Sequence, residues 1–198
     1  MRIVQCMIQN FRGIQDGTIT VAEHGVIFGQ NNVGKSTIIE ALALALGREQ
    51  MAQPLSDWDF WGGDPKPQSR ITIICTISHF GANARPEGFP DWFVGEHSGR
   101  AVWWDETSAK VKTDADCPKG CILAAQIALC IRFDEELADF ECIRYFYDGP
   151  GDPFSTECRK VPNALVQEWV GVVLQAKRQW EKLLSFGSSS FLKVLEAS

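Results

Sequence analysis

Nine consecutive residues have the types and the spacing needed to hold a chain of phosphates. They are Gly29, Gln30, Asn31, Asn32, Val33, Gly34, Lys35, Ser36 and Thr37, and they fit the pattern G-x-x-x-x-G-K-[ST] at every fixed position. The two glycines allow main-chain amides to approach phosphates closely, and Lys35 brings a mobile positive charge. Ser36 offers a hydroxyl to Mg²⁺, with Thr37 as the second choice. The pattern predicts a loop that binds ATP with Mg²⁺, in which Lys35 is the candidate catalytic residue.

Two elements must flank such a loop. Residues 25–28 (Gly-Val-Ile-Phe) are typical of a short buried strand that leads into it, and residues 36–46 form an apolar run that predicts a helix. Gly47 is a usual residue at a helix end. Because the first amides of a helix are unpaired and its dipole is positive there, the start of this helix favours an anion.

The composition restricts the class of protein. With 198 residues, 45% of them hydrophobic, the chain is long enough to form a sizeable core. A net charge of −6 argues against a freestanding nucleic-acid-binding domain. Seven cysteines without a disulfide-like spacing indicate reduced thiols, and no apolar run is long enough to span a bilayer. We expect a soluble cytoplasmic protein with no membrane partner, and we assign no metal site to Cys117 and Cys121.

The remaining segments predict mainly strands. Residues 2–10 and 18–21 precede the loop, and residues 71–80 alternate in a way that predicts a strand buried largely on one face. Further strands are expected at 101–104, 109–113, 121–133 and 141–147, which together indicate an antiparallel sheet. Beyond residue 160 we expect a helix at 161–169, a short buried strand at 170–174 and the start of another helix at 177–184.

Four blocks of residues carry a family resemblance. Residues 8–13 (Ile-Gln-Asn-Phe-Arg-Gly), the loop at 29–37 and Glu40-Ala41-Leu42 resemble the opening of the RecF/SMC/OLD group of ABC-type ATPases. Residues 55–60 (Leu-Ser-Asp-Trp-Asp-Phe) resemble the OLD-type ATP-dependent endonucleases in particular. The resemblance implies that Arg12 lies near the nucleotide as a secondary ligand. The alternative is that Arg12 is a solvated turn residue.

The same resemblance implies an α/β fold, that of a P-loop NTPase. The chain would be the N-terminal lobe of an ABC-type head, with a P-loop core at 1–60, an antiparallel β-subdomain at 61–160 and a strand with the start of a helical segment at 161–198. It also implies ATP hydrolysis in a complete homodimer of heads, coupled to DNA processing in DNA repair or phage defence. DNA would bind through the rest of the protein.

Hydrolysis also needs an acidic strand end that holds Mg²⁺, and ABC-type ATPases add a signature segment and a water-sensing glutamine. Three segments of the sequence are candidates for these parts. Asp134-Glu135 follows a strand that Arg132 interrupts, which favours a charged strand end in solvent over a metal ligand. Residues 184–188 resemble an ABC signature only superficially, and Gln175 is a weak candidate for a water-sensing glutamine. We therefore expect this chain alone to be inactive as an ATPase.

Two other classes of function remain open from the sequence. The first is a complete small P-loop NTPase or kinase with Asp134 on Mg²⁺, which would require Asp134 to lie beside Ser36 at the end of a parallel strand. The second is an interaction module that binds nucleotide without turning it over. A hydrolase triad has no support, because the three histidines are scattered. The tryptophans at 58, 61, 103 and 104 lie among acids and are expected to pack in the interior.

Overall fold

Seven antiparallel strands form one sheet in the part of the chain that the structure describes. The structure is a computed structural model, and it describes residues 1–30, 33–47, 55–81, 83–134, 136 and 138–167. The strands follow the spatial order β2-β1-β3-β6-β4-β5, and β7 pairs with β6. Their bounds are β1 Arg2–Phe11, β2 Ile14–Thr20, β3 Ile71–Ser78, β4 Val102–Asp105, β5 Lys110–Lys112, β6 Cys121–Asp134 and β7 Asp139–Phe146. Strands from residues 1–60 and strands from residues 61–160 therefore belong to one sheet.

The longest strand, β6, is the centre of the sheet. It pairs with β3 along one edge, and along its other edge with β4 through its first residues and with β7 through its last ones. The short connection between β6 and β7 makes them a hairpin, as do the connections between β1 and β2 and between β4 and β5. The strands expected between residues 71 and 147 are thus confirmed, with ends within a few residues of the predicted ones.

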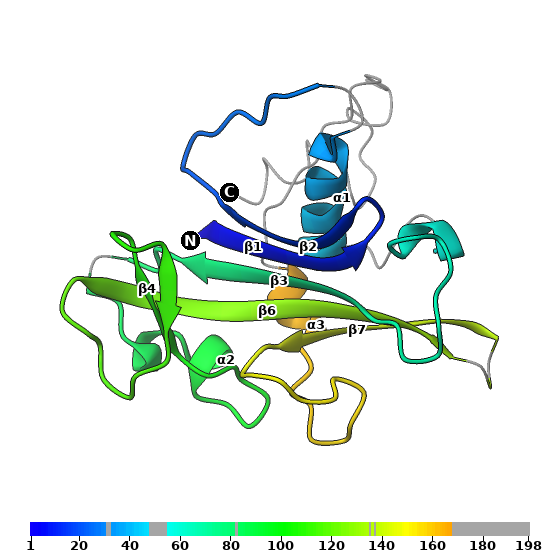
Figure 1. Cartoon of the computed structure of the whole chain (residues 1–198). Coiled ribbons are helices and arrows are strands. Elements are labelled where there is room, and N and C mark those ends of the chain that lie inside the picture. Colours follow the sequence, from blue (N-terminus) through cyan, green and yellow to red (C-terminus); the bar gives the residue numbers. More distant parts are fainter. Residues whose placement is uncertain (31–32, 48–54, 82, 135, 137, 168–198) are drawn as a thin grey trace, which may run out of the picture.

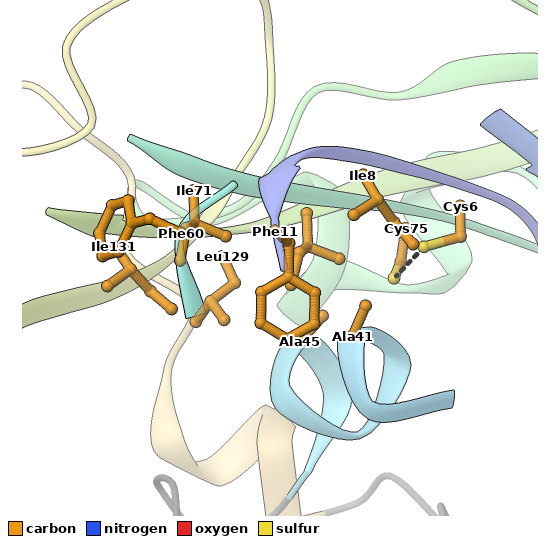
Figure 2. Packing of buried hydrophobic residues seen from close by; sticks show 11 residues of the cluster. Cys6, Ile8, Phe11, Ala41, Ala45, Phe60, Ile71, Cys75, Leu129 and Ile131 are labelled. Atoms are coloured by element: carbon orange, nitrogen blue, oxygen red, sulfur yellow. Dashed lines mark hydrogen bonds between the residues drawn. The ribbon is translucent and has the colours of Figure 1, made fainter. Parts of the chain in front are cut away.

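Helix α1, Lys35–Leu46, packs on one face of the sheet (Figure 1). Its fully buried residues are Ala41 and Ala45, whose small side chains let the helix approach the strands closely. Figure 2 shows Phe11 of β1 beside these alanines, in a cluster that also contains residues of β3 and β6. The buried members of the cluster are Cys6, Ile8, Phe11, Ala41, Ala45, Phe60, Ile71, Ile73, Cys75, Leu129 and Ile131. The helix expected at 36–46 is therefore present and begins one residue earlier.

The remaining helices are short. They are α2, Pro90–Phe93, and α3, Asn163–Gln167, with 3₁₀ turns at Asp57–Asp59 and Pro86–Gly88. Trp92 of α2 packs edge-on against Phe80 and Phe146, which anchors the long loop after β3 to the sheet. The helix expected at 161–169 is described only as far as Gln167. The strand and helix expected at 170–174 and 177–184 lie outside the described residues.

The prediction for β3 was wrong in one respect, because the strand is buried on both faces. Ile73 and Cys75 face the cluster around α1, whereas Ile74 packs with Ala128 and Cys130 on the opposite face. Phe154, from the loop after β7, packs against this second cluster. An alternation of Ile with Thr and Ser does not reveal such a cover, since the covering loop is remote in the sequence.

The prediction of a buried strand at 25–28 was also wrong. This segment forms no strand, and the side chains of Val26 and Phe28 are 85% and 89% exposed. The N–H of Val21 still donates to the carbonyl of Val4 at 2.8 Å, but the chain then leaves the sheet, as Figure 1 shows for the blue segment that leads up to α1. Because β2 and β3 already occupy the two edges of β1, the segment cannot pair with β1.

The tryptophans divide into two groups. Trp103 and Trp104 on β4 are buried as expected, but Trp58 and Trp61 are exposed, which corrects their predicted place in the interior. All seven cysteines are free thiols, and the described residues contain no group of side chains that could hold a metal ion. Within the same residues, no helix has the length and apolar character needed to cross a membrane.

The buried thiol of Cys130 makes the stability of the fold depend on pH. Burial raises the pKa of this thiol from its ordinary value of 9.0 to about 11. Since the folded protein favours the neutral thiol, this contribution to stability is complete below pH 9.0 and is lost as the pH rises through 11. We expect Cys130→Ala to lessen the fall in unfolding free energy between about pH 8 and 11, measured by urea titration.

The matched control is Cys117→Ala, because the Cys117 thiol is exposed. This variant should keep the pH dependence of the wild-type protein. If Cys130→Ala and the wild-type protein lost stability equally over this pH range, the role assigned to the buried thiol would be wrong.

Candidate functional site

The start of α1 is open to an anion. Gly34 precedes the helix with φ 90° and ψ 9°, a left-handed conformation that side chains disfavour, and no side chain caps the helix. The first turn contains no acidic residue that would repel a negative charge. The helical ladder begins with the N–H of Ile38, which donates to the carbonyl of Gly34 at 3.1 Å. The amides before it have no partner within the helix, as at the start of any helix, so they are suited to donate to a ligand.

The loop before α1 is tightly built. A side chain at position 29 would place its Cβ 3.2 Å from Cγ2 of Val33, across the loop. At position 34, a Cβ would lie 3.9 Å from the side chain of Ile14, in addition to the strained φ. The β1–β2 hairpin therefore lies against the loop. Glycine at both positions leaves room for main chain to close around a ligand, and Asn31 and Asn32 lie outside the described residues.

The side chain of Lys35 reaches back across this loop. Its Nζ donates to the carbonyl of Gly29 at 2.8 Å and also to the carbonyl of Gln30. Both acceptors are neutral, so these contacts hold the ammonium in place without cancelling its charge. The candidate ligand residues Lys35, Ser36 and Gly34 thus come together at the helix start. The side chain of Ser36 is exposed and that of Thr37 is half-buried.

Arg12 lies in the turn between β1 and β2 and contacts two carboxylates. Its Nε donates to Oδ1 of Asp59 at 2.8 Å, and its Nη1 forms an ion pair with Oε2 of Glu40. Its own N–H donates to the carbonyl of Asp59 at 2.8 Å. Oδ2 of Asp59 accepts in turn from the N–H of Ser56 at 2.9 Å. Arg12 is therefore a partner of protein side chains here, and its role as a nucleotide ligand stays a prediction.

This ion-pair cluster joins three segments that are far apart in the sequence. Arg12 comes from the β1–β2 turn, Glu40 from the second turn of α1, and Asp59 from the 3₁₀ turn Asp57–Asp59. A backbone bridge between Phe11 and Phe60 supports the same junction. Three of the four blocks that carried the family resemblance, residues 8–13, 40–42 and 55–60, thus meet at one place. Sequence reasoning singled out Arg12 but not its two partners, although both stand inside the blocks.

The end of α1 has a partner that the sequence did not single out. The helix has no basic residue in its last turn, and Arg144 of β7 donates to its terminal carbonyls instead. The lack of a basic residue in the last turn is the only sign in the sequence that a remote residue must supply the positive charge. Nothing in the pattern indicates which of the remote arginines or lysines supplies it.

Asp134 is the other candidate residue that the structure describes. Asp134 is the last residue of β6 and opens the hairpin to β7, where its carboxylate accepts from the N–H of Glu136 at 2.9 Å. Both pairings of this part of β6 are antiparallel, so Asp134 is not at the end of a parallel strand. Glu135, Gln175 and residues 184–188 lie outside the described residues.

A scan against protein families gives one result that bears on this site. The family model of the AAA ATPase domain matches residues 1–145, which include the loop, α1 and most of the sheet. This match supports ATP binding and an ATPase function. None of the curated proteins matches the chain significantly. Because the matched part is well over half of the 198 residues, the chain belongs to the AAA ATPase domain family.

Proposed function

We propose that this chain binds Mg·ATP through the phosphate loop at 29–37 and the start of α1. The observation that carries the proposal is the open N-terminus of α1, where uncapped amides and the Lys35 ammonium face the same loop. A helix start of this kind stabilises phosphate through its amides and its dipole. The match to the AAA ATPase domain family supports the same ligand.

The residues present fit a nucleotide with its metal ion. A Cβ would be tight against Val33 at position 29, and the positive φ disfavours a side chain at position 34, so glycine at both positions lets the backbone close around phosphates. Lys35 would bind the β- and γ-phosphates, and the exposed Ser36 hydroxyl would contribute a ligand to Mg²⁺. Mg²⁺ neutralises phosphate charge when bound, while the loop residues orient the phosphates and Lys35 holds a positive charge against them.

For the wider activity, we propose hydrolysis of ATP in a homodimer of complete heads, coupled to DNA processing in the cytoplasm. The support is the resemblance to OLD, RecF and SMC proteins. Three of the four blocks that carry it contain Arg12, Glu40 and Asp59, which form one ion-pair cluster. Stimulation of ATP turnover by DNA, measured on the protein in its full-length context, tests this wider proposal.

The alternative of a small complete NTPase loses support from the position of Asp134 in an antiparallel hairpin. The alternative of a binding module without turnover differs from our proposal only in hydrolysis. It is distinguished by phosphate release once the complete head is assembled.

We expect Lys35→Ala to reduce Mg·ATP affinity at least about a hundredfold, because a charged hydrogen-bond donor is lost from the phosphate site. The overall fold should survive, since the hydrogen bonds of Lys35 to described residues go to the exposed loop. Isothermal titration calorimetry gives the affinity and circular dichroism gives the fold. Lys110→Ala is the matched control, because it removes an exposed lysine from the edge strand β5. Equal affinities of the wild-type protein and Lys35→Ala would show that the loop assignment is wrong.

A second pair of variants separates the two candidate Mg²⁺ ligands. Ser36→Ala should lower the gain in ATP affinity that Mg²⁺ provides, whereas Asp134→Asn should leave this gain within about twofold of wild type. Titrations of ATP with and without Mg²⁺ measure the gain. A large loss in Asp134→Asn together with none in Ser36→Ala would favour the small-enzyme alternative.

We also expect the 198-residue chain to bind ATP but to hydrolyse it negligibly. All strands that the structure describes are antiparallel, so none of them brings an acidic parallel-strand end to Ser36. Without a group that orients water, binding contributes little to the chemical step. A phosphate-release assay with Lys35→Ala as background measures turnover. Robust multiple turnover by the wild-type chain would contradict this expectation.

A further inference from the structure

One arginine satisfies the C-terminal end of the helix that forms the candidate site. Nε of Arg144 donates to the carbonyl of Ala45 at 2.7 Å, and its Nη2 donates to the carbonyls of Leu44 at 3.1 Å and Gly47 at 2.9 Å. The last four carbonyls of a helix have no partner within it, and a cation there is favoured by the dipole. Arg144 provides both the hydrogen-bond donors and the positive charge, from a strand about 100 residues away in the sequence.

Arg144 is itself firmly held by the sheet. It lies on β7 opposite Leu129 of β6, and its carbonyl accepts from the N–H of Val161 at 3.1 Å. Its side chain is half-buried, and burial lowers the pKa of its guanidinium, partly offset by the nearby thiols of Cys142 and Cys75. A planar guanidinium with several fixed donors is suited to hold several carbonyls in one geometry. The contact therefore ties the end of α1 to the framework of the sheet.

The consequence reaches the other end of the helix. Twelve residues of α-helix form a rod about 18 Å long, so a fixed C-terminus restricts where the N-terminal amides point. The ion pair of Glu40 with Arg12 gives a second point of attachment nearer the phosphate loop. Direct attraction between Arg144 and a phosphate would act over about twice the Debye length of physiological salt and is largely screened. An effect of Arg144 on the ligand must therefore act through the position of the helix.

We propose that Arg144 is a positioning residue for nucleotide binding: by holding the C-terminal carbonyls of α1 against β7, it aims the opposite end of the helix and Lys35 at the phosphates. This inference rests on the proposed function of the loop. It assigns to a residue outside the phosphate-loop motif a share in the affinity for Mg·ATP. A residue that only capped the helix would contribute to stability and not to the affinity of the folded protein.

The test compares two substitutions of Arg144 with one control. Arg144→Met keeps an unbranched side chain but removes every donor, and Arg144→Lys keeps the charge with a single donor group. The control is Arg132→Met on the neighbouring strand β6, because Arg132 is also a partly buried arginine but pairs with Glu141 at 2.8 Å. The Kd for Mg·ATP is measured by calorimetry, at a temperature where thermal scans show each protein to be fully folded.

We expect Arg144→Met to raise the Kd about tenfold and Arg144→Lys to raise it by about threefold, since misplacement of binding groups by a fraction of an ångström is costly. Arg132→Met should leave the Kd within about twofold of wild type, whatever it does to the melting temperature. If Arg144→Met lowers the melting temperature but leaves the Kd unchanged, the arginine is only a structural cap and the inference is overturned.

The same data separate this inference from the proposed function. If the wild-type protein binds Mg·ATP and both Arg144 variants bind it equally well, the inference alone is wrong. If the wild-type protein does not bind, the proposed function is wrong and the inference falls with it. Should Arg144→Met fail to fold, Arg144→Lys decides by the same criterion: a Kd raised threefold or more supports positioning, and an unchanged Kd overturns it.

Discussion

The polarity of one helix is the constraint on which the candidate site depends. Every α-helix leaves amides unpaired at its start and carbonyls unpaired at its end, and both ends must find partners. In α1 the carbonyl end is satisfied by Arg144, whereas the amide end has no side-chain cap and no acidic residue in its first turn. The two ends thus differ, because the carbonyl end accepts from a side chain and the amide end has no side-chain cap. A helix that is complete at one end and open at the other is suited to bind an anion at the open end.

Apolar burial and the ion-pair cluster contribute to this arrangement in different ways. Fully buried side chains such as Ile8 and Phe11 each stabilise the fold by about 1.5–3 kcal/mol, and they hold α1 on the sheet. The pairs of Arg12 with Glu40 and Asp59 are partly exposed to solvent, where an ion pair typically contributes about 0–1 kcal/mol. Their main effect is therefore on geometry: they fix how the helix is rotated and translated on a surface that the apolar contacts alone would leave less specific.

Local patterns were enough to predict α1 and the strands between residues 71 and 147, because strand and helix periods are encoded by neighbouring residues. The contacts that complete the site are not local. Arg144 and Ala45 are 99 residues apart and Arg12 and Asp59 are 47 apart, so no periodicity joins them. Residues 25–28 show the opposite failure, because an apolar run indicates a tendency to be buried but not what covers it. Val26 and Phe28 are exposed, and β1 has no free edge with which their segment could pair.

The contacts of Lys35 show how the loop and its ligand depend on one another. The ammonium has three donors, and two of them already go to the carbonyls of Gly29 and Gln30. These contacts draw the loop around the lysine and keep its charge near the helix start. A phosphate would meet that charge without first displacing a carboxylate, which would hold the ammonium far more strongly than a neutral carbonyl does. The lysine can therefore organise the loop in the absence of a ligand and still bind phosphate, and the same side chain links the shape of the site to its electrostatics.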